Sequence, residues 1–192
     1  ERIRDAVSRM TQLMESTLAA ARMQDGGIQI KIESCDIKEL LVSACQRQQE
    51  ICRKHIITCD LVDFPDSIQA DASALDQVFT NLLSNAVKYA PKAPLIEVTG
   101  ECDGRDIVVR VRDHGIGIDA DELEKIGERF FRARTSTGIA GTGIGLNLVH
   151  KIVGLHQGVV SVESKKGTGS VFIIRLPIAG PTIEAPAERI AS

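Results

Sequence analysis

The sequence predicts an α+β fold in which one mixed sheet carries helices on one face and a single long helix precedes it. Two observations support this class. Runs with alternating apolar and polar side chains, typical of strands, and runs with helical periodicity both occur several times. They follow one another without the regular β-α-β rhythm of a doubly wound fold. With 192 residues, 43% of them hydrophobic, the chain can bury one ordinary core and carry a small extension.

The first 27 residues predict the long helix. Between Ile3 and Ala21 the apolar and small residues recur every seven positions, with a second stripe beside them, which gives the helix a wide apolar face. Asp25-Gly26-Gly27 ends the pattern, because glycine adopts the positive φ that terminates helices. The pattern is already established at the first residue, so we expect the helix to continue upstream.

Capping, alternation and turn signals predict the remaining elements. Asp36 and Glu39 resemble a capping box at the start of a helix. Asp71 can cap a long helix that Pro91 ends, and Asp103-Gly104 marks a hairpin. The predicted strands are residues 28–32, 55–62, 95–101, 106–112, 158–164 and 170–176, and the predicted helices are residues 37–53, 72–90 and 143–156, with a short helical piece after residue 119.

Two segments predict irregular structure. Residues 134–143, RTSTGIAGTG, hold small and polar side chains with little to bury, which predicts a mobile loop. Residues 179–192 show no periodicity and predict a disordered tail.

Composition and charge exclude several classes of protein. The net charge of -3 argues against binding to nucleic acid or to an anionic membrane, because both favour clustered Lys and Arg. No apolar run reaches the roughly 18 residues of a membrane span, and the first residues lack the apolar core of a signal peptide. We therefore expect a soluble, cytoplasmic segment that could meet a membrane only through upstream segments. The five cysteines form no C-x-x-C pair, which favours reduced thiols.

The segment NLLSNAVKYAP carries the first candidate site. Asn81, Asn85, Lys88 and Tyr89 lie three or four residues apart and share one helix face. Asparagine is a poor residue inside a helix, so two of them one turn apart indicate either a polar face or a functional one. In the functional interpretation, an Asn oxygen is a suitable ligand for Mg²⁺, which takes few protein ligands beside phosphate oxygens. Lys88 would then be a point charge for phosphate.

The segment Asp113-His114-Gly115-Ile116-Gly117 follows a predicted strand directly. Two glycines after a strand usually indicate a turn. An acid placed before them can also accept a hydrogen bond from an exocyclic amine, while the missing side chains let a flat ring approach the backbone. Adenine has both features, so this segment is a candidate base site.

Two further glycine motifs follow. Gly141 to Val149, GTGIGLNLV, runs from the predicted loop into a helix. Backbone N–H groups at a helix start bind phosphate, and glycines permit its close approach; the alternative is a flexible hinge. Gly167-Thr168-Gly169-Ser170 lies before the last strand and is compatible with a tight hairpin.

Three arginines, Arg129, Arg132 and Arg134, surround Phe130 and Phe131 just ahead of the loop. The two aromatic side chains could serve only as anchors of a lid. Alternatively, an arginine could swing onto a terminal phosphate when the lid closes.

Taken together, these motifs resemble the ATP-binding domain of histidine kinases, a branch of the GHKL superfamily that also includes DNA gyrase B and MutL. The resemblance covers about Asp71 to Pro177 and implies a Bergerat-type sandwich with a flexible ATP lid. It implies that Asp113 contacts adenine, that Asn85 ligates Mg²⁺, and that Tyr89 packs near the base. It also implies that Lys88 and Arg132 serve the phosphates and act in catalysis. The nucleotide contacts that it implies are Asn81, Asn85, Lys88, Tyr89, Asp113, Gly115, Ile116, Gly117, Arg132, Gly141, Thr142, Gly143, Ile144, Gly145, Leu146 and Thr168.

One residue separates the branches of this superfamily. In the gyrase-like ATPases a glutamate that activates water lies one helical turn before the metal-binding asparagine, whereas this sequence has Asn81 there. An amide cannot act as a general base. We therefore expect slow hydrolysis and transfer of the γ-phosphoryl to an external nucleophile.

The first helix resembles the second helix of the dimerisation and phosphotransfer hairpin of these kinases. The partner helix would carry the phosphoacceptor histidine in an H-E-x-R-T-P-like motif. None of His55, His114, His150 and His156 has such surroundings, so we expect the acceptor to lie outside this chain and the chain alone not to autophosphorylate. The predicted parts are an incomplete hairpin over 1–27, an ATP-binding catalytic domain over 28–178 and a tail over 179–192.

The resemblance implies the partners as well. A response-regulator receiver domain would accept the phosphoryl group on an aspartate, and the full-length protein would form a homodimer through the helical hairpin. Two alternatives stay open: a degenerate nucleotide-binding or interaction module without transfer, and a serine or threonine kinase of the anti-sigma type, which shares this ATP site.

Overall fold

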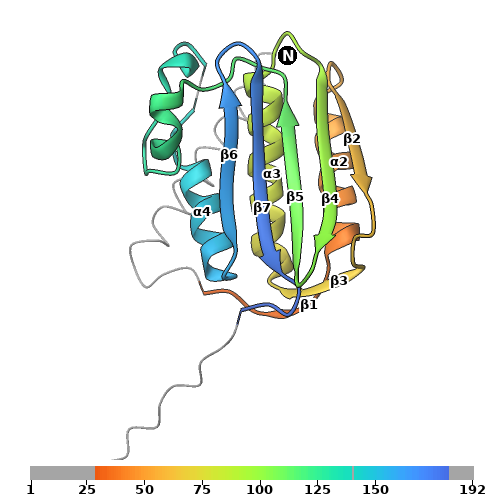
Figure 1. The fold of residues 1–192 in the computed structure, drawn as a ribbon. Helices are drawn as coiled ribbons and strands as arrows, with labels where there is room; N and C mark the ends of the chain where they lie inside the picture. The colour runs from red at the N-terminus through yellow and green to blue at the C-terminus, as the bar shows by residue number, and fades with distance from the viewer. Residues whose placement is uncertain (1–28, 140, 182–192) are drawn as a thin grey trace, which may run out of the picture.

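The computed structural model describes residues 29–139 and 141–181. It contains a five-stranded sheet, a small two-stranded sheet and three α-helices (Figure 1). The predicted helix over residues 1–27 and most of the predicted tail lie outside the described residues, and the three-part division of the chain stays a prediction. In chain order the elements are β1 (Glu33–Asp36), α2 (Ile37–Ile51), β2 (Ile56–Leu61), β3 (Ser67–Ala70), α3 (Ala72–Tyr89), β4 (Leu95–Asp103), β5 (Asp106–Asp113), the 3-10 helices η1 (Ala120–Lys125) and η2 (Arg134–Ser136), α4 (Gly145–Leu155), β6 (Val159–Lys165) and β7 (Gly169–Pro177).

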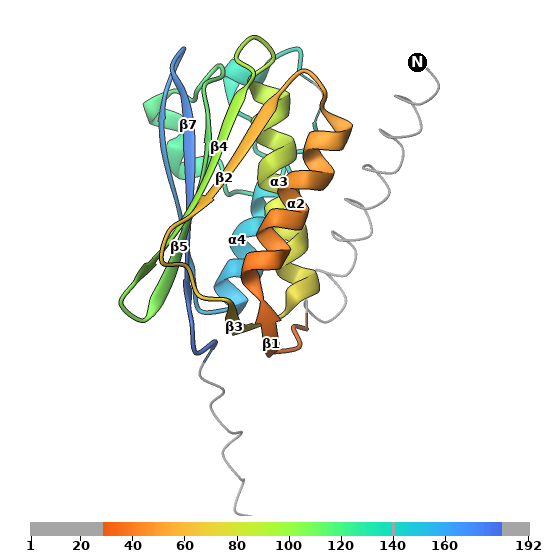
Figure 2. The same cartoon turned by 90° about the vertical axis from the view of Figure 1, so that its right-hand side faces the viewer.

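The predicted α+β class is confirmed. The large sheet has the order β2-β4-β5-β7-β6; β2 runs parallel to β4 and the other neighbours are antiparallel. All three α-helices cover one face of this sheet (Figure 2). None of the helices in the described residues is long and apolar enough to cross a membrane.

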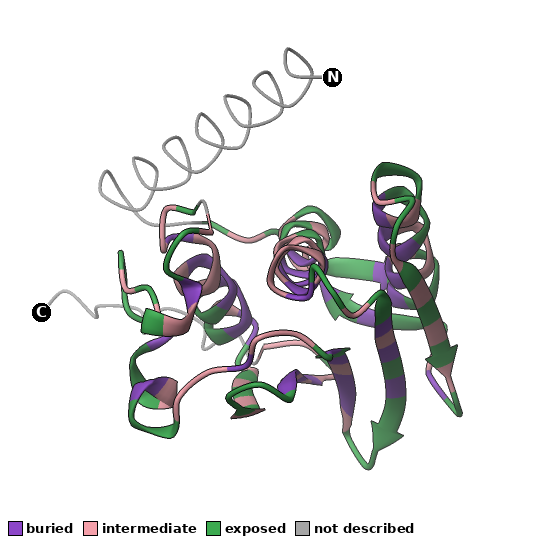
Figure 3. Ribbon diagram, turned by 90° about the horizontal axis from the view of Figure 1, so that it is seen from above, coloured by how far each residue is buried: buried purple, intermediate pink, exposed green. Residues whose placement is uncertain are grey.

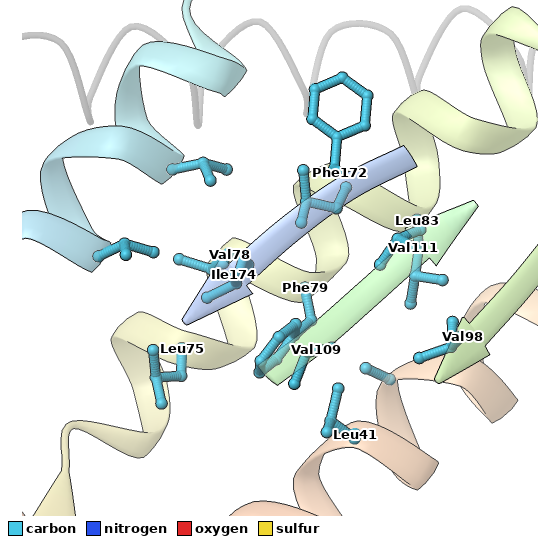
Figure 4. Packing of buried hydrophobic residues seen from close by; sticks show 14 of the residues in the cluster. Leu41, Leu75, Val78, Phe79, Leu83, Val98, Val109, Val111, Phe172 and Ile174 are labelled. Carbon is cyan, nitrogen blue, oxygen red and sulfur yellow. The ribbon is translucent and has the colours of Figure 1, made fainter. Parts of the chain in front are cut away.

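The core lies between the helices and the covered face of the sheet. Residues of β2, β6 and most of β4 alternate in burial along the strand (Figure 3). By contrast, β5 and β7 carry runs of consecutive buried residues. Phe79 of α3 is fully buried and lies beside Val109 of β5, and Ile174 of β7 lies beside Val78 of α3 (Figure 4). Leu41 of α2 belongs to the same cluster. Because α3 lies in the middle of this layer, one of its faces is committed to the core and the other remains available for a site.

The prediction of a strand over residues 28–32 is wrong. Residues 29–32 are irregular, and the strand is β1, which ends where α2 begins. It pairs with β3, a strand that the sequence analysis missed, so that Cys35 lies opposite Ile68 and both are buried. Four-residue strands carry little periodicity of their own, and here the pairing partner lies more than 30 residues away along the chain.

The predicted start of the last helix is also wrong by two residues. Gly143 has a φ of 72°, which lies in the left-handed region and cannot continue an α-helix. Helix α4 therefore begins at Gly145. The capping prediction for α2 is confirmed, because the Asp36 carboxylate accepts a hydrogen bond from the Glu39 N–H at 2.9 Å.

Asp71 caps α3 as predicted and also joins it to α4. Its carboxylate accepts hydrogen bonds from the N–H groups of Ala74 at 2.9 Å and Lys31 at 2.8 Å. Its own N–H donates to Nε2 of His156 at 3.0 Å. His156 is buried and lies 2.8 Å through Nδ1 from the Ile152 carbonyl. The N-terminus of α3 is therefore held by the C-terminus of α4, and His156 serves the core.

We expect Asp71→Ala to lower the free energy of unfolding by about 1–2 kcal/mol at pH 7, the usual effect of losing an N-cap. Burial acts to raise the pKa of the Asp71 carboxyl, but the N–H groups of Lys31 and Ala74 outweigh it and lower that pKa below its ordinary value. A carboxyl with a lowered folded-state pKa stabilises the fold above its unfolded pKa of about 3.9 and loses that effect as the pH falls through the folded value.

Urea denaturation at a series of pH values measures this effect. The difference between parent and Asp71→Ala should narrow as the pH is taken below about 4. Asp66→Ala is the control, because the Asp66 carboxylate is 90% exposed and its one ion-pair partner among the described residues is Lys38, at 3.6 Å. An equal loss of stability in both variants would contradict the capping role.

Candidate nucleotide site

A cavity of about 980 Å³ opens between α3, the segment after β5, the segment before α4 and the first turn of α4. This volume is in the range of cavities that bind cofactors. All the residues predicted to contact nucleotide line it except Gly115 and Thr168. The fold therefore gathers motifs that are about 60 residues apart in the sequence around one space.

The α3 wall of the cavity carries the two asparagines. Leu82 and Leu83 are buried in the core, whereas Asn81 and Asn85 line the cavity. The Asn81 amide nitrogen donates to the Gln77 carbonyl at 2.8 Å. Among the residues that the structure describes, no hydrogen-bond partner occupies the Asn85 amide, so its oxygen is available to a ligand.

The last turn of α3 brings a positive charge to the same wall. Lys88 Nζ donates to the Tyr89 hydroxyl at 3.0 Å and lies 4.6 Å from the centroid of its ring. A Cβ atom at Gly141 would lie 2.5 Å from Lys88 Nζ. The glycine therefore lets the chain before α4 pass directly over this ammonium group.

Asp113 ends β5 and is buried beside the cavity, with 5% of its surface exposed. Its carboxylate accepts hydrogen bonds from the N–H groups of Gly115, at 2.8 Å, and Ser170. Burial nevertheless dominates and raises the pKa of Asp113 above its ordinary value. A buried carboxylate at a cavity wall is a strong acceptor, because its partners in water have been removed.

Gly115 does not line the cavity but has a positional role. The Ile116 N–H donates to the Tyr89 carbonyl at 3.0 Å, and a side chain at Gly115 would collide with the same carbonyl. Glycine at this position therefore lets the segment after β5 lie directly on the end of α3. This contact brings Asp113 and the asparagine face to one cavity.

The closing glycine motif contributes differently from the prediction. Thr168 is exposed in the turn between β6 and β7 and lies outside the cavity, because the turn is tied down by the Gly167 N–H, which donates to the Ile116 carbonyl at 2.7 Å. Ser170, two residues later, lines the cavity and is buried. Its contact with Asp113 depends on the register of β5 and β7, which places Ser170 opposite Asp113. The sequence gives no direct signal for this register.

The start of α4 has the features of a phosphate site. The position before the helix is Ile144, whose side chain makes no capping hydrogen bond, so the N–H groups of the first turn are not satisfied by a cap. Gly145 and Leu146 line the cavity. A side chain at Gly145 would lie 2.8 Å from the Asn81 amide oxygen, so α4 begins in contact with α3. Uncapped N–H groups at a helix start attract anions.

The segment predicted as a mobile loop contains a short 3-10 helix. It includes η2, and the Arg132 guanidinium donates to the carbonyls of Ser136, at 3.2 Å, and Ile139. Arg132 lines the cavity as predicted, but its hydrogen bonds go to this segment. Phe131 packs against the core, whereas Phe130 is 61% exposed, so only one of the two aromatic side chains is an anchor.

The residues present fit a magnesium ion that is shared with phosphate. No group of three or more His, Cys, Asp or Glu side chains that could hold a metal occurs in residues 29–139 and 141–181. The open Asn85 amide oxygen is instead one neutral ligand beside the uncapped start of α4. Magnesium bound with nucleotide usually takes one or two protein ligands and completes its shell with phosphate oxygens and water.

The histidines lie elsewhere. His55 Nε2 is 3.0 Å from the Ala90 carbonyl, and His114 Nε2 is 2.8 Å from Glu97 Oε2. Burial lowers the pKa of His150. Within the described part of the chain, no histidine lines the cavity. The location of the phosphoacceptor outside the chain stays a prediction.

Residues 70–180 match the family model described as "Histidine kinase-, DNA gyrase B-, and HSP90-like ATPase". The chain belongs to this family. Among curated relatives it is 38% identical over 120 residues to the sensor histidine kinase RcsC of Salmonella typhimurium, covering 62% of this chain and 13% of RcsC. It is 30% identical over 170 residues to the sensor protein KdpD of Clostridium acetobutylicum, covering 88% of this chain and 19% of KdpD. The chain thus spans less than a fifth of either relative.

Solved structures support the histidine kinase branch. The mycobacterial sensor histidine kinase MprB has a TM-score of 0.70 and 25% identity, with 78% of this chain and 100% of that chain covered. The catalytic domain of histidine kinase ThkA has a TM-score of 0.67 and 29% identity, with 78% and 97% covered. Full-length ShkA in complex with AMPPNP has a TM-score of 0.76 and 26% identity, with 93% and 38% covered. The chain therefore contains an ATP-binding catalytic domain of the histidine kinase type with the Bergerat-type fold.

Proposed function

We propose that this domain binds Mg-ATP and transfers its γ-phosphoryl group to a histidine outside the chain, for relay to an aspartate of a response regulator. One observation carries the proposal. The Asn81 and Asn85 face of α3, the uncapped start of α4 and the buried Asp113 line the same cavity. This arrangement separates a site for a base from a site for phosphates. The relatives named as sensor histidine kinases support the same conclusion.

Each wall of the cavity has a role in this proposal. Asp113 accepts a hydrogen bond from the exocyclic amine of adenine, and the N–H groups at the start of α4 bind the phosphates. Lys88 neutralises phosphate charge. The Asn85 oxygen ligates Mg²⁺, which supplies charge neutralisation on the phosphate oxygens when bound.

The transfer itself requires little covalent chemistry from the domain. A nitrogen of the acceptor imidazole attacks the γ-phosphorus, the bond between that phosphorus and the β–γ bridging oxygen breaks, and ADP leaves with the electron pair. Positioning and charge stabilisation therefore dominate catalysis. Arg132 at the cavity wall can add charge stabilisation once phosphate competes for its guanidinium with the carbonyls that it now binds.

Hydrolysis is disfavoured because the described residues offer no carboxylate that could activate water near Asn85. Asn81 occupies the position one turn earlier on α3. Among the described residues, the carboxylates that line the cavity are Asp113 and Asp76. Asp113 accepts hydrogen bonds from two backbone N–H groups. Asp76 pairs with Arg47 and lies about 13 Å from Asn85 along the axis of α3, at 1.5 Å per residue.

Incubation with γ-labelled ATP, with and without a separately supplied helical hairpin that carries the acceptor histidine, tests the proposal. We expect no label on the chain alone and acid-labile, alkali-stable label on the hairpin when both are present. In the full-length protein, the hairpin would also form the homodimer. Acid-stable label would instead indicate serine or threonine phosphorylation. Tight ATP binding without any transfer would indicate a binding module, and rapid ADP release without label would indicate an ATPase.

A further inference from the structure

The lid segment, which we define as residues 130–139 and 141–143, is closed on itself at its base. The Phe130 N–H donates to the Gly143 carbonyl at 3.1 Å. Inside the segment, the Ser136 hydroxyl donates to the Ala133 carbonyl at 2.6 Å, and Arg132 donates to the carbonyls of Ser136 and Ile139. The residues around η2 therefore form a small hydrogen-bonded unit beside the cavity.

A buried acid attaches this unit to η1. Glu122 is 7% exposed. Its two carboxylate oxygens each lie 3.2 Å from the Arg134 N–H, and Oε1 lies 3.4 Å from Arg134 Nε. A buried carboxylate is costly unless it is paired and hydrogen-bonded, so this attachment is strongly favoured once the lid segment is in place.

The same arginine has a second, exposed partner. Arg134 lies 2.7 Å from Asp121, and both side chains are more than 60% exposed. Exposed ion pairs contribute little. Asp121 and Glu122 are thus adjacent residues that both contact Arg134, one exposed and the other buried. This difference makes them a matched pair for mutagenesis.

The residue after Arg134 carries an unexplained polar atom. Thr135 lines the nucleotide cavity, and its hydroxyl oxygen is buried without a hydrogen-bond partner. It is the one buried side-chain nitrogen or oxygen with this property among residues 29–139 and 141–181. Buried polar groups in proteins are nearly always satisfied, so an unsatisfied hydroxyl at a cavity wall indicates a contact that a ligand completes.

We propose that the Thr135 hydroxyl is a further nucleotide contact, which donates a hydrogen bond to a phosphate oxygen, and that Glu122 is the positioning residue that holds it there. The inference rests on the proposed ATP site. Phosphate is favoured over the base because Thr135 lies three residues after Arg132, in the segment that leads to the start of α4. The uncapped start of that helix lines the same cavity as Thr135. Glu122 acts through Arg134, whose backbone continues directly into Thr135.

Thr135→Val tests the contact because valine has nearly the same shape without the hydroxyl. We expect this variant to bind the non-hydrolysable analogue AMPPNP several-fold to tenfold more weakly in calorimetry, the usual range for one lost hydrogen bond. Thr135→Ser should restore most of the affinity. Adenosine, which lacks phosphate, should bind the parent and Thr135→Val equally.

The melting temperature of the nucleotide-free protein should not fall in the same variant, in contrast to its affinity for AMPPNP. Removing an unsatisfied buried hydroxyl relieves a desolvation penalty, so Thr135→Val should melt at the same temperature as the parent or higher. A residue with a purely structural role would lose stability and affinity together. Thr135→Val with unchanged AMPPNP affinity, or with an equal loss for adenosine, would overturn the phosphate contact.

Limited trypsin digestion tests the positioning role without nucleotide. Glu122→Ala should speed cleavage after Arg132 and Arg134 about tenfold or more, since the attachment of the lid segment is lost. Glu122→Gln should be intermediate, because its amide oxygen can still accept the Arg134 N–H. Asp121→Asn and Glu124→Gln are the controls, and both should stay within about twofold of the parent. Cleavage after Arg110, inside β5 in the middle of the large sheet, requires the sheet to unfold and should not change.

The binding and digestion experiments test the two parts of the proposal separately. Equal cleavage rates in the parent and both Glu122 variants, or an effect of Asp121→Asn as large as that of Glu122→Ala, would overturn the positioning role. Glu122→Ala should also weaken AMPPNP binding and raise KM for ATP more than it lowers kcat. If the parent itself binds no AMPPNP, the proposed function fails along with the Thr135 contact, while digestion still decides whether Glu122 attaches the lid segment.

Discussion

Asp113→Asn should weaken ATP binding roughly 10- to 100-fold and remove the preference for adenine over guanine nucleotides. The carboxylate is buried at the cavity wall and already accepts the N–H groups of Gly115 and Ser170, so it is oriented to accept a further donor. A hydrogen bond to a charged group is worth more than a neutral one. The amide of asparagine would also present its own donor to the base.

The same substitution should not destabilise the protein at pH 7. Burial raises the pKa of Asp113, so the folded state disfavours its ionised form. The stabilisation that this group provides is complete below its unfolded pKa of about 3.9 and is lost as the pH rises through the higher folded value. At pH 7 the parent therefore carries an unfavourable charge that asparagine removes. We expect a melting temperature equal to or above that of the parent.

Calorimetry with ATP and GTP, together with thermal unfolding, measures both effects. Because the pKa of Asp113 is raised, the ATP affinity of the parent should begin to fall at a higher pH than the pH at which an ordinary carboxyl is protonated. Asp106→Asn on the same strand is the control, because Asp106 pairs with Arg175 far from the cavity. Equal binding of ATP and GTP by the parent would contradict the assignment of Asp113 to adenine.

Asn85→Ala should reduce phosphoryl transfer at least about 100-fold, the size of loss seen when one group that stabilises developing charge is removed. Its amide oxygen is a neutral ligand that lines the cavity without a partner in the described residues. Asn85→Asp should also impair Mg-ATP use, because it changes the charge of the site and its grip on the metal. Removal of Mg²⁺ with a chelator should reduce transfer by the parent to the same low level.

Two measurements distinguish a loss of the metal ligand from a general loss of structure. Mg²⁺ should tighten ATP binding in the parent but not in Asn85→Ala, while binding without Mg²⁺ should be similar in both. Asn147→Ala is the control, because the Asn147 amide donates to the Gly127 carbonyl at 2.9 Å and does not line the cavity. Unchanged transfer and an unchanged response to Mg²⁺ in Asn85→Ala would exclude Asn85 as the metal ligand.

The parts of the fold that could be predicted depend on interactions between residues close in sequence. Asp71 and Pro91 bracket α3, because capping and helix termination act within one turn. The hairpin of β4 and β5 followed from Asp103-Gly104. The pair of β1 and β3 could not be predicted, because each strand has four residues and exists only through its partner.

The candidate site divides in the same way. The shared face of Asn81 and Asn85 is a matter of helical spacing. The resemblance of the sequence motifs to histidine kinases implied an ATP site with an amide where a hydrolytic enzyme would have a general base. Tertiary structure decided the surroundings: which groups satisfy Arg132, how burial raises the pKa of Asp113, and why the Thr135 hydroxyl lacks a partner. These properties arise from contacts between segments distant in sequence and from removal of water, and neither is encoded in local spacing.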